Sequence, residues 1–154
     1  MHMKNEKYTP EQAKKGQKII KYFAKFQASV FLLSKGKLWN KWPGGYPIMV
    51  VETRGAKSNK IRNIPLIYVH KDGLPILVAS MGGMPKNPNW YYNVKANKHL
   101  KISTIHGAGN YIAEELSKED KYDLWPLICS FYPDYENYQN NTQREIPVFL
   151  CKKL

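Results

Sequence analysis

The chain has 154 residues, of which 43% are hydrophobic and 23% are charged, and its formal net charge is +12 at pH 7. A chain of this length can bury a core within one domain without staples, and the spacing of Cys129 and Cys151 fits neither a disulfide framework nor a metal site, so we expect two buried thiols. No apolar stretch approaches the ~18 residues of a membrane span, and the N-terminus lacks the apolar part of a signal peptide, which predicts a cytoplasmic protein.

The basic charge is concentrated in residues 1–42, which carry ten lysines and two glutamates, whereas residues 43–154 contribute only +4. Thr9 followed by Pro10 is typical of a helix start, and apolar residues then recur at helical spacing as far as Ser34. This predicts an amphipathic helix whose apolar stripe is Ile19, Phe23, Phe26, Val30 and Leu33. Two roles stay open: a helix packed on the protein with its lysines in water, or peripheral contact with an anionic membrane.

Short extended segments follow, without a helix after each of them, which favours an antiparallel β-barrel over a doubly wound parallel sheet. The expected strands are 48–52, 64–69, 76–80, 100–105, 111–116 and the closing "IPVFLC". The sequence "HKDGLP" predicts a hairpin turn. We expect short helices at about 88–96, from Ser117 to a kink or early end at Pro126, and from Pro133. The simplest division is a helix and linker at 1–42 and a barrel at 43–154, within one domain.

The first stretch that could carry chemistry is the turn "TRGAKSNKIRN", which begins at Thr53. Its cations surround a glycine and a serine, and the backbone of such a turn can point N–H groups at a ligand. Arginine adds a planar fork that matches phosphate or carboxylate. The four cations are Arg54, Lys57, Lys60 and Arg62. The turn therefore predicts an anion-binding site, with a solvated hairpin loop as the alternative.

The second stretch is "ASMGGMPKNPNWYYN", which runs from Ala79 to Asn93. A predicted strand passes here into two glycines, so the backbone can approach a flat ligand closely. Trp90 and Asn93 would add an aromatic wall and an amide. An ordinary rigid turn with Trp90 in the core is the alternative interpretation.

The third stretch is "YPDYENYQ", in which Tyr132, Tyr135 and Tyr138 share one side of a helix. Buried hydroxyls need partners, so the pattern fits a phenolic wall and a core position equally well.

The sequence shows no motif for a metal site, for nucleophilic hydrolysis or for nucleotide binding. The histidines show no metal-ligand spacing, Ser80 is not in a G-x-S-x-G elbow, and the glycines form neither a G-x-G-x-x-G motif nor a Walker loop.

Taken in order, "ETRGAKSNKIRNIPLIYV", "VASMGGMPKNPNWYYNVKAN" and "YPDYENYQNNTQREIPVF" resemble the deazaflavin-dependent nitroreductase family, the coenzyme F-420-dependent oxidoreductases. The resemblance covers roughly residues 45–150. It implies an α+β, mainly β fold: a split antiparallel β-barrel of the FMN-binding type with an N-terminal amphipathic helix and short packing helices. It also implies hydride transfer from the reduced 8-hydroxy-5-deazaflavin coenzyme to a quinone-like or nitro-activated acceptor.

The resemblance assigns roles to particular residues. Ser80 and Tyr135 become the candidate catalytic residues, because a hydroxyl donor can stabilise charge on the acceptor. Tyr132, Tyr135 and Tyr138 would bind the acceptor. The implied cofactor-binding residues are Lys57, Ser58, Lys60, Arg62, Pro65, Leu66, Ile67, Val78, Ala79, Ser80, Met81, Gly82, Trp90 and Asn93.

Two departures and two rivals accompany this prediction. Met81 stands where relatives often have a basic residue, and Pro126 interrupts the helix before the tyrosines. One rival is a barrel that uses FMN or only carries a flavin or deazaflavin. The other is a nucleic-acid-binding module, which the pI near 9.6 permits but for which the chain shows no recognition motif. No metal is expected, and the oligomeric state stays open.

Overall fold

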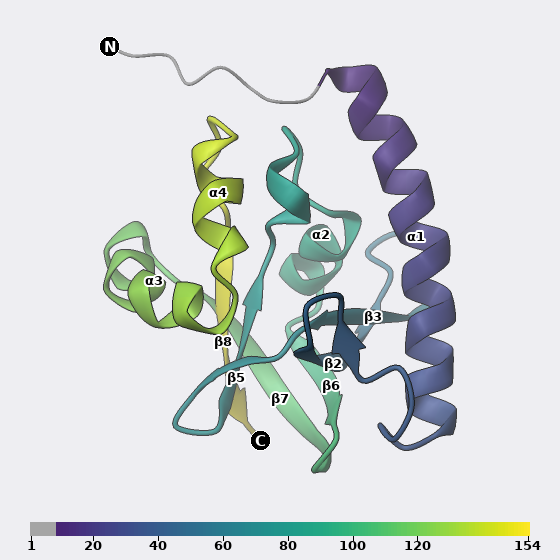
Figure 1. The fold of residues 1–154 in the computed structure, drawn as a ribbon. Helices are drawn as coiled ribbons and strands as arrows, with labels where there is room; N and C mark the ends of the chain where they lie inside the picture. Colours follow the sequence, from purple (N-terminus) through teal and green to yellow (C-terminus); the bar gives the residue numbers. More distant parts are fainter. Residues whose placement is uncertain (1–8) are drawn as a thin grey trace.

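The computed structural model describes residues 9–154; residues 1–8, the start of the predicted basic segment, lie outside the described residues. Helices and strands follow one another as shown in Figure 1. Their bounds are α1 (Pro10–Leu33), β1 (Lys41–Trp42), β2 (Tyr46–Arg54), β3 (Ile61–Ile67), β4 (Val69–Lys71), β5 (Leu74–Val78), η1 (Met81–Gly83), α2 (Asn89–Ala96), β6 (His99–Thr104), β7 (Gly107–Glu115), α3 (Lys118–Phe131), α4 (Asp134–Asn140) and β8 (Val148–Lys153).

The strands form one antiparallel sheet in the order β1-β2-β6-β7-β8-β5-β4, with β3 paired to β2. This confirms the antiparallel barrel over the doubly wound alternative. The predicted hairpin at "HKDGLP" joins β4 to β5. Its two turn residues, Asp72 and Gly73, have φ values of 51° and 79°, and positive φ at both positions is what a tight hairpin requires.

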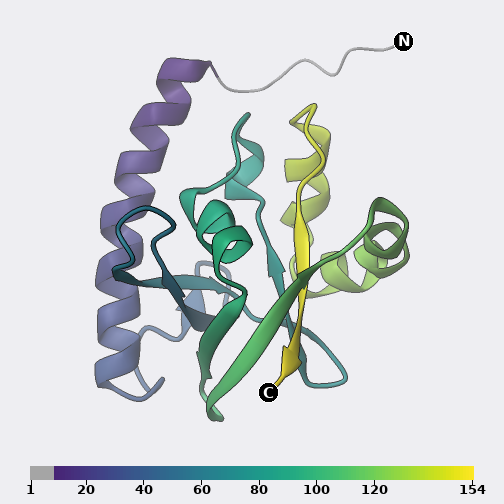
Figure 2. The same ribbon diagram turned by 180° about the vertical axis from the view of Figure 1, so that it is seen from behind.

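Two apolar clusters lie on opposite faces of the sheet. One fills the barrel, where side chains such as Met49, Leu77 and Phe149 meet Trp90 of α2. The other lies beneath α3 and α4, where Ile128 and its neighbours cover β4, β5 and β8. Figures 1 and 2 show α3 and α4 on one side of the molecule and α1 on the other, and all three helices pack outside the barrel, where α1 lies against Ile48 and Val50 of β2. Fully burying one such side chain contributes roughly 1.5–3 kcal/mol, so these faces anchor the helices.

The structure differs from the predicted elements at the segment 64–69 and in the length of α3, and it adds the short strand β1 inside the predicted linker. The expected strand 64–69 is divided: β3 pairs with β2, and after Tyr68 the chain joins β5 as β4. The early end of α3 at Pro126 is wrong, because the helix continues to Phe131. Pro126 and Tyr122 are both exposed, so water can hydrate the carbonyl that proline leaves without its helical donor. Cys151 is buried as expected, and Cys129 is partly exposed.

Helix α1 begins where the sequence predicts. The Thr9 hydroxyl accepts from the Gln12 N–H at 3.2 Å, and the Gln12 side chain accepts from the Thr9 N–H at 2.9 Å. This reciprocal pair is a capping box, and Pro10 occupies the first helical position. In residues 9–154 no helix combines the length and apolar character needed to cross a bilayer.

The face that α1 packs is not the predicted stripe. Gln27, Ala28 and Phe31 are buried, and this cluster lies against β2. The ends of the predicted stripe face outward, since Ile19 is 71% exposed and Leu33 is 87% exposed. Its middle is covered only in part, where the rings of Phe23 and Phe26 contact Trp39. The buried face is the one that fits its surroundings: Ala28 and Phe31 pack with Ile48 and Val50 of β2. The Gln27 amide donates to the Trp39 and Lys41 carbonyls, each at 3.3 Å.

Candidate functional site

A cavity of about 1300 Å³ lies between α1 and the rest of the molecule. Its walls come from α1, the β2–β3 turn, β3, the loop after β5, α2 and the tyrosine segment. Twelve of the predicted cofactor-binding residues line it: Lys57, Ser58, Arg62, Pro65, Leu66, Ile67, Val78, Ser80, Met81, Gly82, Trp90 and Asn93. Segments that are far apart in sequence thus meet at one place.

The cation turn is built by its own backbone and tied to α2. The Gly55 N–H donates to the Lys60 carbonyl at 2.8 Å, and the Asn59 N–H donates back to the Gly55 carbonyl at 2.8 Å. The Ala56 N–H donates to the Asn93 amide oxygen at 2.9 Å. Asn93 therefore holds the turn in place, a role that its sequence position did not suggest. Lys60 contributes its backbone to the turn but does not line the cavity.

The floor of the cavity is apolar. Pro65, Leu66 and Ile67 of β3 are partly exposed and line it, and Val78 continues the surface from β5. Ala79 was predicted to join them but is fully buried in the barrel cluster. The reason is the pleat: successive residues of an extended segment point to opposite faces, so Val78 and Ser80 face the cavity and Ala79 does not.

The loop after β5 bends sharply where it reaches the cavity. Met81, Gly82 and Gly83 all have positive φ, with values of 46°, 64° and 78°. A Cβ on Gly83 would lie 2.6 Å from the Tyr138 carbonyl oxygen, so glycine is needed there for close approach as well as for conformation. The loop and α4 consequently pack backbone against backbone, which fixes the polar loop relative to the tyrosines.

The three predicted tyrosines all line the cavity. The hydroxyls of Tyr132 and Tyr138 lie 3.1 Å apart, and the rings of Tyr132 and Tyr135 are edge to face with centroids 4.9 Å apart. Burial raises the pKa of Tyr135 well above its usual 10.0, and burial, followed by the Tyr138 hydrogen bond, also raises the pKa of Tyr132. Both phenols are therefore neutral hydrogen-bond donors at physiological pH. Tyr46, outside the predicted set, packs edge to face against Tyr132, with the ring centroids 4.8 Å apart.

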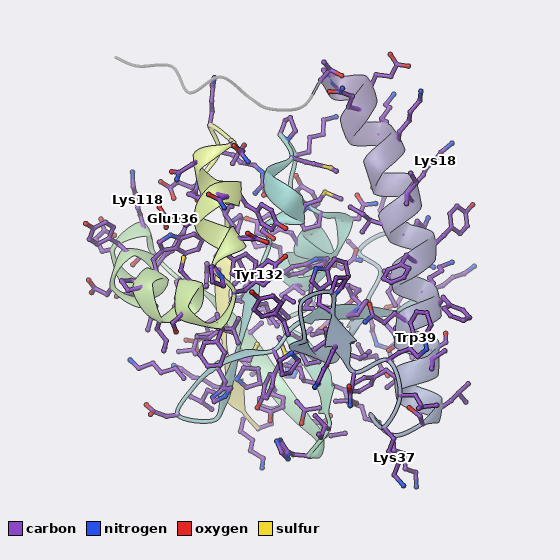
Figure 3. The ribbon with its side chains drawn as sticks, viewed as in Figure 1. Lys18, Lys37, Trp39, Lys118, Tyr132 and Glu136 are labelled. Carbon is purple, nitrogen blue, oxygen red and sulfur yellow. The ribbon has the colours of Figure 1, made fainter. Side chains whose placement is uncertain are left out.

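The opposite wall is the lysine face of α1, for which the sequence suggested either solvation or contact with an anionic membrane. In Figure 3, Tyr132 near α4 and Lys18 on α1 mark the two sides. The lysines that line the cavity are Lys14, Lys15, Lys18, Lys21 and Lys25. Gly16 allows Met84 of the β5 loop to reach the helix, because a Cβ there would collide with the Met84 methyl group. Their spacing already predicted that these lysines share one face of the helix, but no local signal in the sequence indicates that this face borders the cavity.

The sides of the cavity therefore differ in chemistry. Cations stand at the β2–β3 turn and along α1, an apolar floor lies on β3, and neutral phenols stand on the remaining side. Opposed cationic groups in a concave site attract and orient anions, while a flat apolar floor suits a planar ring. The arrangement fits an elongated molecule with one anionic end and one planar end, and leaves the tyrosines to face a second molecule.

Comparisons with known proteins agree on one family. The family model described as F420H(2)-dependent quinone reductase matches residues 24–153. The F420H(2)-dependent quinone reductase Rv1261c of Mycobacterium tuberculosis is 31% identical over 128 residues, which cover 81% of this chain and 86% of that relative.

Two solved structures are also similar. One, described as an F420-H2 dependent reductase (FDR-A), has 42% sequence identity and a TM-score of 0.65, covering 69% of this chain and 94% of that chain. Another, described as a domain-swapped dimer, has 36% identity and a TM-score of 0.66, covering 83% of this chain and 96% of that chain. The range of the family match includes the cation turn, the β5 loop and the tyrosines, but begins within α1.

Proposed function

This chain belongs to the F420H(2)-dependent quinone reductase family, and we propose that its cavity is where the reduced deazaflavin coenzyme F-420 passes a hydride to a quinone. It is accordingly an oxidoreductase whose cofactor is the deazaflavin. The observation that carries the assignment of the site is the polarity of the cavity, with cations at one end, an apolar floor and phenols beyond it.

The residues present fit this coenzyme. Lys57 and Arg62 would hold its anionic end, because charge-assisted hydrogen bonds to a cationic turn are the strongest polar contacts that such a surface offers. The apolar residues of β3 would support its ring, and the backbone at Ser80 and Gly82 would meet the polar edge of that ring. Trp90, which is 7% exposed, would close the site from α2.

The coenzyme, when bound, supplies the hydride, and the chain supplies orientation and a site from which water is excluded. Tyr132, Tyr135 and Tyr138 would hold the quinone ring by stacking against it. Because burial keeps the Tyr135 phenol protonated, its hydroxyl can donate to the quinone oxygen on which negative charge develops. Ser80, at the edge of the same cavity, is the second candidate donor.

The choice between deazaflavin and FMN can be tested by intrinsic tryptophan fluorescence, because Trp90 lines the cavity. We expect quenching by micromolar deazaflavin and little quenching by FMN at the same concentration. Tight binding of FMN with weak binding of deazaflavin would support the flavoprotein alternative. A protein that binds the deazaflavin but shows no turnover with any acceptor would be a carrier.

The acceptor can be narrowed by a turnover screen. We propose a quinone as the physiological acceptor, with activated nitro compounds as further acceptors that the same tyrosine wall admits. The screen would use reduced deazaflavin with quinones and nitroaromatic compounds of matched size. Higher kcat/KM for the quinones is the expected result, and turnover of the nitro compounds alone would contradict the assignment of acceptor.

We further propose peripheral contact with an anionic membrane through the outer face of α1. Ile19, Phe26 and Leu33 are exposed on this face, and Lys35 and Lys37, exposed just after the helix, would meet anionic headgroups. Such contact would bring the cavity to a lipid-dissolved quinone. Sedimentation with phosphatidylglycerol vesicles tests this: the protein should co-sediment, and Ile19→Ser with Phe26→Ser should remain in solution. Equal sedimentation of both proteins would contradict the proposal.

A further inference from the structure

Arg144 lies between α4 and β8, outside the elements that line the cavity, yet its side chain reaches the loop after β5. Its Nη2 donates to the Ser80 carbonyl at 2.7 Å, its Nη1 to the Ala79 carbonyl at 3.1 Å, and its Nε to the Met84 carbonyl at 2.9 Å. Nη1 also donates to the Asn87 amide oxygen at 2.7 Å. One guanidinium thus joins both ends of the bend that faces the cavity.

This bend needs external support. It contains three residues with positive φ, and Met81, unlike the two glycines that follow it, carries a side chain in that conformation. Such a conformation costs on the order of 1 kcal/mol for a residue with a Cβ and persists where the surroundings over-determine it. Within the bend, the Gly83 N–H donates to the Ser80 carbonyl at 2.9 Å. Arg144 adds bonds to carbonyls on both sides of that turn.

Hydrogen bonds through Gln139 also fix the backbone that carries Arg144. The Gln139 amide donates to the Arg144 carbonyl at 2.8 Å. The Gln139 oxygen accepts from the Lys121 ammonium at 2.7 Å and from the Ile146 N–H at 3.0 Å. Lys121 also donates to the Glu145 carboxylate at 2.9 Å. The segment that carries Arg144 is therefore fastened to α3 and α4, so its guanidinium presents a fixed fork to the loop.

We infer that Arg144 is a positioning residue: its guanidinium holds the Ser80–Met84 loop in the shape that presents Ser80 and Gly82 to the deazaflavin ring. This inference rests on the proposed function of the cavity. Lysine could not replace it, because an ammonium is a point charge and cannot reach acceptors in the directions that a planar fork serves. The role belongs to the geometry of the side chain and not to its charge alone.

The test compares Arg144→Ala and Arg144→Lys with Ile102→Val, a buried change in the barrel away from the cavity. Each purified full-length variant is checked for folding by circular dichroism and for its Tm. Deazaflavin affinity is measured by tryptophan quenching, and KM is measured separately for the deazaflavin and for the quinone. Asn87→Ala, which removes one acceptor and leaves the arginine, provides a milder change if Arg144→Ala does not fold.

We expect Arg144→Ala to raise the Kd for the deazaflavin at least tenfold and Arg144→Lys to raise it at least fivefold. The KM for the quinone should stay within twofold, and Asn87→Ala should raise the Kd two- to fivefold. Ile102→Val should leave the Kd for the deazaflavin unchanged, even if it lowers the Tm. Unchanged deazaflavin affinity in Arg144→Ala, or wild-type affinity in Arg144→Lys, would overturn the inference. A wild-type protein that does not bind deazaflavin would instead overturn the proposed function.

Discussion

The two walls of the cavity are built in different ways. The wall formed by the β5 loop, α2 and α4 is held by contacts between particular atoms, such as the Asn93 bond to the cation turn and the approach of Gly83 to Tyr138. The α1 wall presents exposed lysines on a helix that packs through a narrow face. Of these lysines, Lys15 pairs with Glu11 of the same helix at 3.9 Å.

This difference separates two kinds of recognition. Contacts that fix backbone positions define the shape of a site, and their loss changes binding at any salt concentration. Exposed cations act at longer range through water, and salt screens them over roughly 8–10 Å at physiological ionic strength. We therefore expect changes in the first wall to alter geometry and changes in α1 to alter electrostatic attraction.

The largest effect is expected from Gly83→Ala. The positive φ alone should cost about 1–2 kcal/mol, and the collision of the new Cβ with the Tyr138 backbone should add about 1–3 kcal/mol of overpacking. Gly82→Ala is the matched control, because Gly82 also has positive φ but nothing lies within 4 Å of its Cβ position. Urea unfolding should show a larger loss of stability for Gly83→Ala, and equal losses would contradict the close packing of loop and helix.

The cation turn should give the next largest effect. Lys57→Ala combined with Arg62→Ala should weaken deazaflavin binding by more than about 1 kcal/mol, because each charge-assisted hydrogen bond contributes about 1.5–3 kcal/mol. Lys71→Ala with Lys98→Ala removes the same charge outside the cavity lining and should leave the Kd within twofold. Equal deazaflavin affinity in the two double variants would show that the cation turn is a solvated loop that does not recognise the anionic end of the coenzyme.

Tyr135→Phe should spare deazaflavin affinity and lower kcat for the quinone about tenfold, which corresponds to about 1.4 kcal/mol. Burial raises the pKa of Tyr135 above 10.0, so its phenol keeps its proton as the pH rises through the neutral range. The ratio of wild-type to Tyr135→Phe kcat should therefore be constant from about pH 6 to pH 9.5. Tyr46→Phe, beside the wall, serves as the control, and full activity of Tyr135→Phe would exclude the hydroxyl from the reaction.

The smallest effect is expected on α1. Changing Lys18, Lys21 and Lys25 together to glutamine should weaken deazaflavin binding about threefold at low salt, since each exposed charge contributes below about 1 kcal/mol. The difference should vanish near 0.5 M salt, where screening is strong. The control changes Lys35, Lys37 and Lys41, which do not line the cavity. A loss of affinity that persists at high salt would show that α1 recognises the ligand by specific contacts, as the other wall does.

Much of the first wall could be predicted from the sequence, because each of its motifs is local. Each motif can be recognised within a few residues: tyrosines at steps of three, a glycine pair after a strand, and cations around a serine. Asn93 could be placed near the site but its partner could not, because Ala56 lies 37 residues away. Arg144 left no local signal for the same reason: its acceptors lie 57 to 65 residues earlier.

The orientation of α1 could not be predicted from its pattern. Periodicity favoured the large apolar residues, whereas the helix packs through Ala28 and Phe31 beside a buried Gln27. A stripe of large residues marks a face that can be buried, but the face that is buried is the one that fits its surroundings, here Ile48 and Val50 of β2. Once α1 turns that way, its lysines border the cavity in place of facing only water.

A crystal structure of the protein with bound deazaflavin tests the central claim most directly. The account predicts the anionic end of the coenzyme within hydrogen-bonding distance of Lys57, Ser58 or Arg62, its ring on the β3 floor beside Ser80, and its exposed face toward Tyr135. Density for the coenzyme elsewhere, for example in the smaller hollow of about 280 Å³ near His99 and Asn110, would contradict it.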